Sequence, residues 1–162
     1  IGENMSVRRI ATLGSGDGYV ASYLHSDKRK GVLLELSARD EELGRDLAMH
    51  VTAINPLVVQ GSDVAPDVVA KEREIYTSQA EGSGKPPEIV EKMVEGRVRK
   101  FLAEVSLLEQ PFVKDTNLKV GALLADKGLQ CRGFVRFEVG EGIEVVEEDF
   151  AAEVAAQIQD AQ

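Results

Sequence analysis

The apolar positions in the first part of the chain alternate with polar ones, and this alternation predicts strands. Residues 5–13 (MSVRRIATL) carry β-branched side chains in rough alternation, as a half-exposed strand does. A glycine-rich turn at 14–18 separates them from two further strand candidates, at 19–25 and 31–36. The short polar link between the last two segments is typical of an antiparallel hairpin. The pattern therefore predicts three extended segments before the first helix.

A helical period replaces the alternation near Asp40. Asp40 is a preferred N-cap residue, and Glu41 and Glu42 follow it at the positive end of the helix dipole. Pro56 ends the helix, because the residue before a proline avoids helical geometry. The apolar face is predicted from residues at spacings of four, four and three: Leu43, Leu47, Val51 and Ile54.

Two longer helical stretches, at 62–81 and 85–107, follow each other across a break rich in glycine and proline, which predicts a helical hairpin. The seam of the second arm is predicted at Val90, Val94, Val98, Phe101 and Val105, and the answering face of the first arm at Val69, Tyr76 and Ala80. Gly96 lies inside the second arm, where glycine costs about 1 kcal/mol relative to alanine. We therefore expect a close backbone approach at Gly96.

The last third of the chain mixes both periods. A short helix is predicted at 120–127 and a strand at 132–139 (RGFVRFEV), and a final helix begins near Asp149. The order of these elements predicts an α+β fold. We expect a small three-stranded antiparallel sheet packed with helices, a projecting antiparallel helical hairpin and a C-terminal helix.

Composition and charge exclude some classes of function. The 162-residue chain has a formal net charge of −9, which argues against direct binding of a nucleic-acid backbone. It contains no apolar stretch of about 18 residues, so we expect no membrane span. Cys131 is the only cysteine, which allows no internal disulfide and favours the cytoplasm or an organelle matrix.

The residues give little support to catalysis. Gly84-Lys85 is followed by proline and lacks the spacing of a phosphate-binding loop. His25, His50 and Cys131 are scattered, so no zinc ligand set or nucleophile–base pair is indicated. We therefore expect no enzyme, no catalytic residue, no metal and no cofactor.

His50 is unusual because it lies close to the predicted apolar face of its helix. It has two interpretations. The first is a core histidine that hydrogen-bonds a neighbouring polar group. The second is a polar group at the edge of an exposed apolar patch, which contacts a partner protein. The residues alone leave both open.

Eight stretches, in order along the whole chain, resemble the C-terminal part of elongation factor Ts. They are residues 1–4, 7–9, 48–51, 84–86, 91–97, 110–113, 133–142 and 149–154. The N-terminal helical module of that family is absent, and so is its Thr-Asp-Phe-Val motif. The opening residues also suggest a fragment of a longer protein.

The resemblance implies a division of the chain into three parts. Residues 1–13 would be the tail of a first core subdomain, as a strand. Residues 14–146 would form the second core subdomain, with a helical hairpin inserted at about 62–107. Residues 147–162 would form a C-terminal helical module.

The resemblance also implies a guanine-nucleotide exchange factor for the GTPase elongation factor Tu, which promotes GDP release by binding the nucleotide-free GTPase. His50 would belong to the contact with the third domain of that partner. Phe150, Val154 and Ile158 are our choice for the apolar face of the C-terminal docking helix.

Two alternatives remain at this point. The chain is either a GTPase-binding fragment without exchange activity, or a structural module whose hairpin mediates self-association, as in a homodimer, or a larger assembly. The resemblance adds one such assembly, because proteins of this family serve as a host subunit of an RNA-phage replicase. An uncovered apolar strip along the hairpin seam would favour oligomers.

Overall fold

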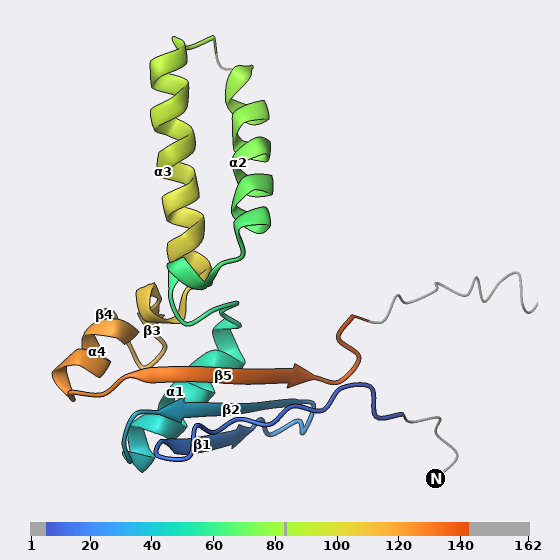
Figure 1. Ribbon diagram of the computed structural model, residues 1–162, viewed down its shortest axis with the longest axis vertical. Coiled ribbons are helices and arrows are strands. Elements are labelled where there is room, and N and C mark those ends of the chain that lie inside the picture. The colour runs from blue at the N-terminus through green and yellow to red at the C-terminus, as the bar shows by residue number, and fades with distance from the viewer. Residues whose placement is uncertain (1–5, 83, 143–162) are drawn as a thin grey trace, which may run out of the picture.

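The alternating segments at the start of the chain build the centre of an α+β fold (Figure 1). The structure is a computed structural model that describes residues 6–82 and 84–142. Its helices and strands are β1 (Tyr19–Leu24), β2 (Lys30–Leu36), α1 (Glu41–Ile54), α2 (Pro66–Glu81), α3 (Pro87–Val105), β3 (Pro111–Phe112), β4 (Asp115–Lys119), α4 (Val120–Asp126) and β5 (Cys131–Glu138). Short 3₁₀ turns at Gly61–Asp63 and Leu107–Glu109 flank the hairpin. The predicted C-terminal helix, with Phe150, Val154 and Ile158, lies outside the described residues.

The three-stranded sheet is antiparallel throughout and has the order β1-β2-β5. The predicted hairpin is confirmed, with Tyr19 opposite Leu36 and Leu24 opposite Gly31. β5 pairs with the other edge of β2, although almost a hundred residues separate the two strands in the sequence. The helical hairpin α2–α3 and the two-stranded sheet β3–β4 are both inserted between β2 and β5 in the sequence. The sequence pattern did not predict the two-stranded sheet.

Helix α1 covers one face of this sheet and forms the main core with it. Leu34 and Leu36 of β2 are fully buried together with Leu47 and Val51 of α1. Asp40 caps the helix as predicted, because its side chain accepts a hydrogen bond from the backbone N–H of Leu43. The predicted apolar face is confirmed for its first three members.

The predictions for Ile54 and for the first extended segment are wrong. The fourth residue of the α1 face, Ile54, is 47 % exposed, since the helix ends there and Asn55 turns the chain away in a left-handed conformation. Residues 6–13 form no strand; Val7 and Ile10 are 83 % and 85 % exposed. Within the part of the chain that the structure describes, this segment pairs with no neighbouring strand, and alternation alone does not stabilise an unpaired strand.

Helices α2 and α3 form the projecting hairpin that the sequence predicts (Figure 1). Val94 and Val98 of α3 are only 4 % exposed, and Val69, Tyr76 and Ala80 of α2 pack against the same cluster. An Arg73–Glu95 ion pair and a 2.7 Å hydrogen bond from Arg97 to Gln79 join the two arms at the surface. Because α2 covers the seam, the hairpin is self-contained along that face.

Gly96 does not mark a close backbone approach. A Cβ atom at this position meets no atom within 4 Å among the described residues. The close approach occurs instead at Gly44 of α1, where a Cβ would lie 2.8 Å from the Cβ of Ala21 in β1. Among the described helices, none is long and apolar enough to cross a lipid bilayer.

Candidate functional site

His50 lies in the core beneath the segment that follows the hairpin, and its side chain is fully buried. Its Nδ1 accepts a hydrogen bond of 3.1 Å from the backbone N–H of Val113. The ring proton therefore lies on Nε2, which donates to the amide oxygen of Gln110 at 2.9 Å. The ring of Phe112 packs nearby, with its centroid 6.1 Å from that of the imidazole.

The bonds continue beyond the histidine. The side-chain amide of Gln110 donates to the backbone carbonyl of Glu104, near the end of α3, at 2.6 Å. A single chain of hydrogen bonds thus links the N–H of Val113, the ring of His50, the amide of Gln110 and the last turn of the hairpin. Each polar group in it has a partner, and a buried network of this kind stabilises one arrangement of the segments that it joins.

Burial lowers the pKa of His50 below the ordinary value of 6.5, and the hydrogen bond with Gln110 opposes this effect only in part. The ring is therefore neutral at neutral pH. Protonation of Nδ1 would place a second ring N–H against the backbone N–H of Val113, and that N–H would lose its acceptor. The site is suited to hold segments together rather than to transfer protons.

Apolar side chains are exposed on the segments that this network joins. Val113, whose N–H bonds to the ring, is 38 % exposed. Ile54 lies one turn after His50 in α1, and Leu57, which is 60 % exposed, bonds through its N–H to the carbonyl of Val105. These side chains offer apolar contact area around a rigid support.

A second buried polar group, Glu35 of β2, has a structural role. It is 3 % exposed and accepts hydrogen bonds from the backbone N–H of Ser15, at 2.9 Å, and from the Ser15 hydroxyl. These bonds from Ser15 lower the pKa of the Glu35 carboxyl. Arg132 lies 3.7 Å from the same carboxylate and also pairs with Asp17. The cluster fastens the predicted glycine-rich turn to the sheet.

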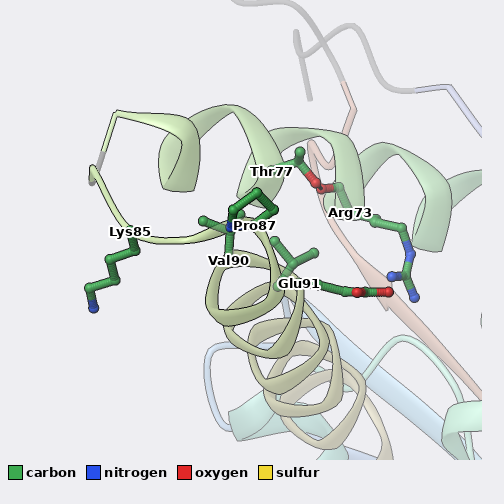
Figure 2. Close-up of a pocket in the computed structure, with 7 residues that line it drawn as sticks. Arg73, Thr77, Lys85, Pro87, Val90 and Glu91 are labelled. Carbon is green, nitrogen blue, oxygen red and sulfur yellow. Dashed lines mark hydrogen bonds between the residues drawn. The ribbon is translucent and has the colours of Figure 1, made fainter.

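A hollow of about 450 Å³ lies between the two arms near the tip of the hairpin (Figure 2). Val90 and Pro87 form its apolar floor, and the side chains of Arg73 and Glu91 extend along one side, while Lys85 points away. Arg73 at its side is paired with Glu95.

The other candidates from the sequence are placed apart or lie outside the described residues. His25 is partly exposed in the β1–β2 turn, 3.0 Å from Asp27, and Cys131 lies half-buried at the start of β5. No group of three or more histidine, cysteine or acidic residues within 6–82 and 84–142 is arranged to hold a metal ion. The assignment of Phe150, Val154 and Ile158 to a docking face stays a prediction.

Sequence reasoning did not identify the partners of His50. Gln110 and Val113 belong to the stretch Gln110-Pro111-Phe112-Val113, which contributes to the family resemblance. A glutamine just before a proline and an aromatic residue gives no periodic signal that points to a histidine sixty positions earlier. Only the fold brings the two together.

The described part of the chain is thus an α+β body with a projecting helical hairpin, whose foot is joined to the body through a buried histidine. Residues 1–141 match the family model described as elongation factor TS. The chain belongs to the elongation factor Ts family.

Curated relatives agree with this assignment. The chain is 58 % identical over 158 residues to elongation factor Ts of Saccharophagus degradans, a match that covers 98 % of this chain and 54 % of the relative. It is 56 % identical to that of Hahella chejuensis and 57 % identical to that of Methylococcus capsulatus, over 159 residues and 98 % of this chain in each case. These matches cover 55 % and 54 % of those relatives. The chain spans about half the length of the curated relatives it matches.

Proposed function

We propose that this chain acts on elongation factor Tu as a guanine-nucleotide exchange factor and promotes GDP release by binding the nucleotide-free GTPase. The observation that carries the proposal is the family match, which runs over residues 1–141. The relatives that share 55–58 % of its residues are elongation factors Ts of bacteria, so the site of action is the bacterial cytoplasm.

The mechanism needs no covalent chemistry. A factor that binds the nucleotide-free GTPase more tightly than the GDP-bound form weakens GDP binding by the same factor, because the coupling between two ligands is reciprocal. A shift of roughly 10⁴-fold corresponds to about 5.5 kcal/mol of differential binding. Contacts that form only with the displaced conformation of the GTPase are enough to supply it.

His50 acts in this proposal as a positioning residue. Its ring is fully buried, so it reaches a partner through the groups that it holds, above all the exposed side chain of Val113. Loss of the ring would release Val113 and Gln110 together, since both bond to it. In the same proposal Phe150, Val154 and Ile158 form the apolar face of a docking helix.

The proposed organisation follows the family. Residues 14–146 form a second core subdomain, with the hairpin inserted at about 62–107. Residues 1–13 are the tail of a first subdomain, and residues 147–162 form a C-terminal module. Because α2 covers the buried valines of α3, the seam between the two helices exposes no apolar strip for self-association. This weighs against a purely structural role for the helical hairpin.

The test is the release of a fluorescent GDP analogue from elongation factor Tu while this chain is titrated in, with direct binding measured in parallel. Accelerated release supports the proposal. Binding without acceleration would instead support the second candidate, a GTPase-binding fragment without exchange activity. Absence of binding overturns both.

A pair of variants tests the role of His50. His50→Ala leaves the N–H of Val113 and the amide of Gln110 without their buried partner, which costs about 1–3 kcal/mol of stability. Binding is therefore scored on the folded fraction. Gln110→Ala breaks the network at its next residue and should weaken binding in the same direction. The control Lys71→Gln, on the exposed surface of α2, should leave binding unchanged. Full affinity of the folded His50→Ala chain would remove His50 from the contact.

A further inference from the structure

A second surface lies at the end of the sheet from which β5 leaves. Figure 1 shows the start of the described chain, the turn between β1 and β2 and the end of β5 at this same end, from which the chain runs beside the sheet to the beginning of β1. Together they surround a hollow of about 560 Å³, which we call the basic hollow. It is defined by Arg8, Arg9, Lys28, Arg29, Phe137 and Val139.

Among residues 6–82 and 84–142, three of the four cations in the basic hollow have no carboxylate partner. Arg9 forms an ion pair of 2.8 Å with Glu141. Arg8 donates to the neutral backbone carbonyl of Glu141 at 2.8 Å, which leaves its charge in place. In the part of the chain that the structure describes, the side chains of Lys28 and Arg29 form no ion pair or hydrogen bond. This concentration of positive charge stands out in a chain of net charge −9.

The floor of the basic hollow is apolar. Val139 is 62 % exposed, and the ring of Phe137 lies beneath the guanidinium of Arg9 at 4.8 Å. Lys28 occupies a left-handed backbone conformation, with φ of 58°, which residues other than glycine rarely adopt. That turn places two cations beside exposed apolar surface.

We propose that the basic hollow binds an acidic peptide segment of a partner protein. Carboxylates of the segment pair with Arg8, Lys28 and Arg29, and an apolar side chain between them packs on the floor. Guanidinium groups suit this role, because they bind carboxylates through two parallel hydrogen bonds. This interaction does not rest on the proposed exchange function and uses different residues.

The same observations favour a peptide over a nucleic acid. The floor of the hollow, with Phe137 and Val139, offers apolar contact that the side chain of a peptide can make and a phosphate backbone cannot. The net charge of −9 opposes the approach of a long polyanion, whose binding depends on counterion release along a basic track. A peptide places its carboxylates farther apart and presents apolar side chains that can pack on Val139.

The test is fluorescence anisotropy with a labelled peptide, Glu-Val-Glu-Phe-Glu-Val-Glu, against the full chain. Two probes are compared with it: the peptide with glutamine in place of each glutamate, and an octamer of uridylate. We expect saturable binding of the acidic peptide, weaker binding of the glutamine peptide, and loss of affinity as salt is raised from about 50 to about 200 mM. Equal binding of the glutamine peptide, tighter binding of the octamer, or no saturable binding of the acidic peptide would each overturn the proposal.

Variants locate the interaction. Arg8→Gln with Arg29→Gln removes two uncompensated cations from exposed positions, and we expect roughly 3- to 10-fold weaker binding of the acidic peptide. The control, Lys71→Gln with Lys92→Gln on the hairpin, makes the same change in net charge at a distance from the hollow and should leave affinity within about twofold. Circular dichroism and a thermal melt establish that both variants are folded. An equal loss in both would assign the binding to overall charge and contradict a specific site.

Discussion

The amide oxygen of Gln110 lies 2.9 Å from Nε2 of His50, and this contact joins α1 to the chain that returns from the hairpin. The two residues are sixty positions apart, and both are buried. Because Gln110 also bonds to the carbonyl of Glu104, the foot of the projecting hairpin is fixed to the sheet domain through a neutral imidazole. The protonation state of one ring therefore bears on how the hairpin is held.

The first prediction concerns pH. The folded state lowers the pKa of His50, mainly by burial, below the value of 6.5. At a pH between the two values the unfolded chain binds more protons, so acidification favours unfolding. We expect the free energy of unfolding to fall as the pH is lowered from about 7.5 to about 5.5, with the contribution from His50 complete above the unfolded pKa. Urea unfolding curves at several pH values measure this slope.

Two variants assign the slope to its source. His50→Gln keeps a donor for Gln110 but does not titrate, so the fall in stability over this pH range should shrink even if the variant is less stable throughout. His25→Gln removes the other histidine of the chain and should keep the slope. An unchanged slope in His50→Gln would contradict the prediction.

The second prediction contrasts one substitution at two glycines in helices. At Gly44, a Cβ would lie 2.8 Å from the Cβ of Ala21 and 3.2 Å from the ring of Tyr19, so Gly44→Ala should destabilise the chain by about 1–3 kcal/mol. At Gly96 the space is open, and Gly96→Ala should stabilise it by about 0.5–1 kcal/mol through helix propensity. Urea midpoints with unchanged m values measure both. Shifts of the same sign would show that the packing around α1 differs from this structure.

The third prediction concerns the end of α1. Asn55 has φ of 55° and ψ of 56°, and its backbone N–H bonds to the carbonyl of Val51. Alanine is strained in this left-handed conformation, so Asn55→Ala should cost about 1 kcal/mol. Asn55→Gly, the matched variant, should be more stable than the alanine variant by about the same amount, because glycine adopts this conformation without strain. Thermal melts of the two variants decide the order, and equal melting temperatures would argue against a left-handed cap.

The elements with strong periodic signals could be predicted from the sequence. The β1–β2 hairpin and α1 with its Asp40 cap are confirmed, because local hydrogen bonding and side-chain spacing determine them. The seam of α3 is confirmed at Val90, Val94 and Val98, but Leu102 continues it in place of the predicted Phe101 and Val105. The prediction of a strand at 5–13 was wrong over the described residues 6–13, because a strand needs a neighbouring strand and the pattern of one segment does not supply it.

The site was less predictable for a related reason. His50 could be singled out by its place near an apolar face, but its partners come from a loop beyond the hairpin. The basic hollow likewise combines the segment before β1, a turn and the end of β5, none of which is basic enough alone to indicate a surface. Contacts between distant segments carry no period, so only the folded chain reveals them.

The fourth prediction concerns Cys131, which lies half-buried at the start of β5. Burial raises the pKa of its thiol from 9.0 to about 11, with the carboxylate of Glu35 acting in the same direction. Since the thiolate is the reactive form, alkylation by iodoacetamide at about pH 8 should be roughly a hundredfold slower than for an unfolded chain.

The rate of mass increase on alkylation, measured with and without urea, provides the test. The native rate should rise steeply with pH up to about 10, because each step adds thiolate that burial had suppressed. Glu35→Gln removes one of the two causes of the raised thiol pKa, so it should speed the reaction in a variant that a thermal melt shows to be folded. Glu109→Gln, on an exposed turn, is the control. A native rate equal to that in urea would mean that the start of β5 opens readily and that the thiol is not held in the core.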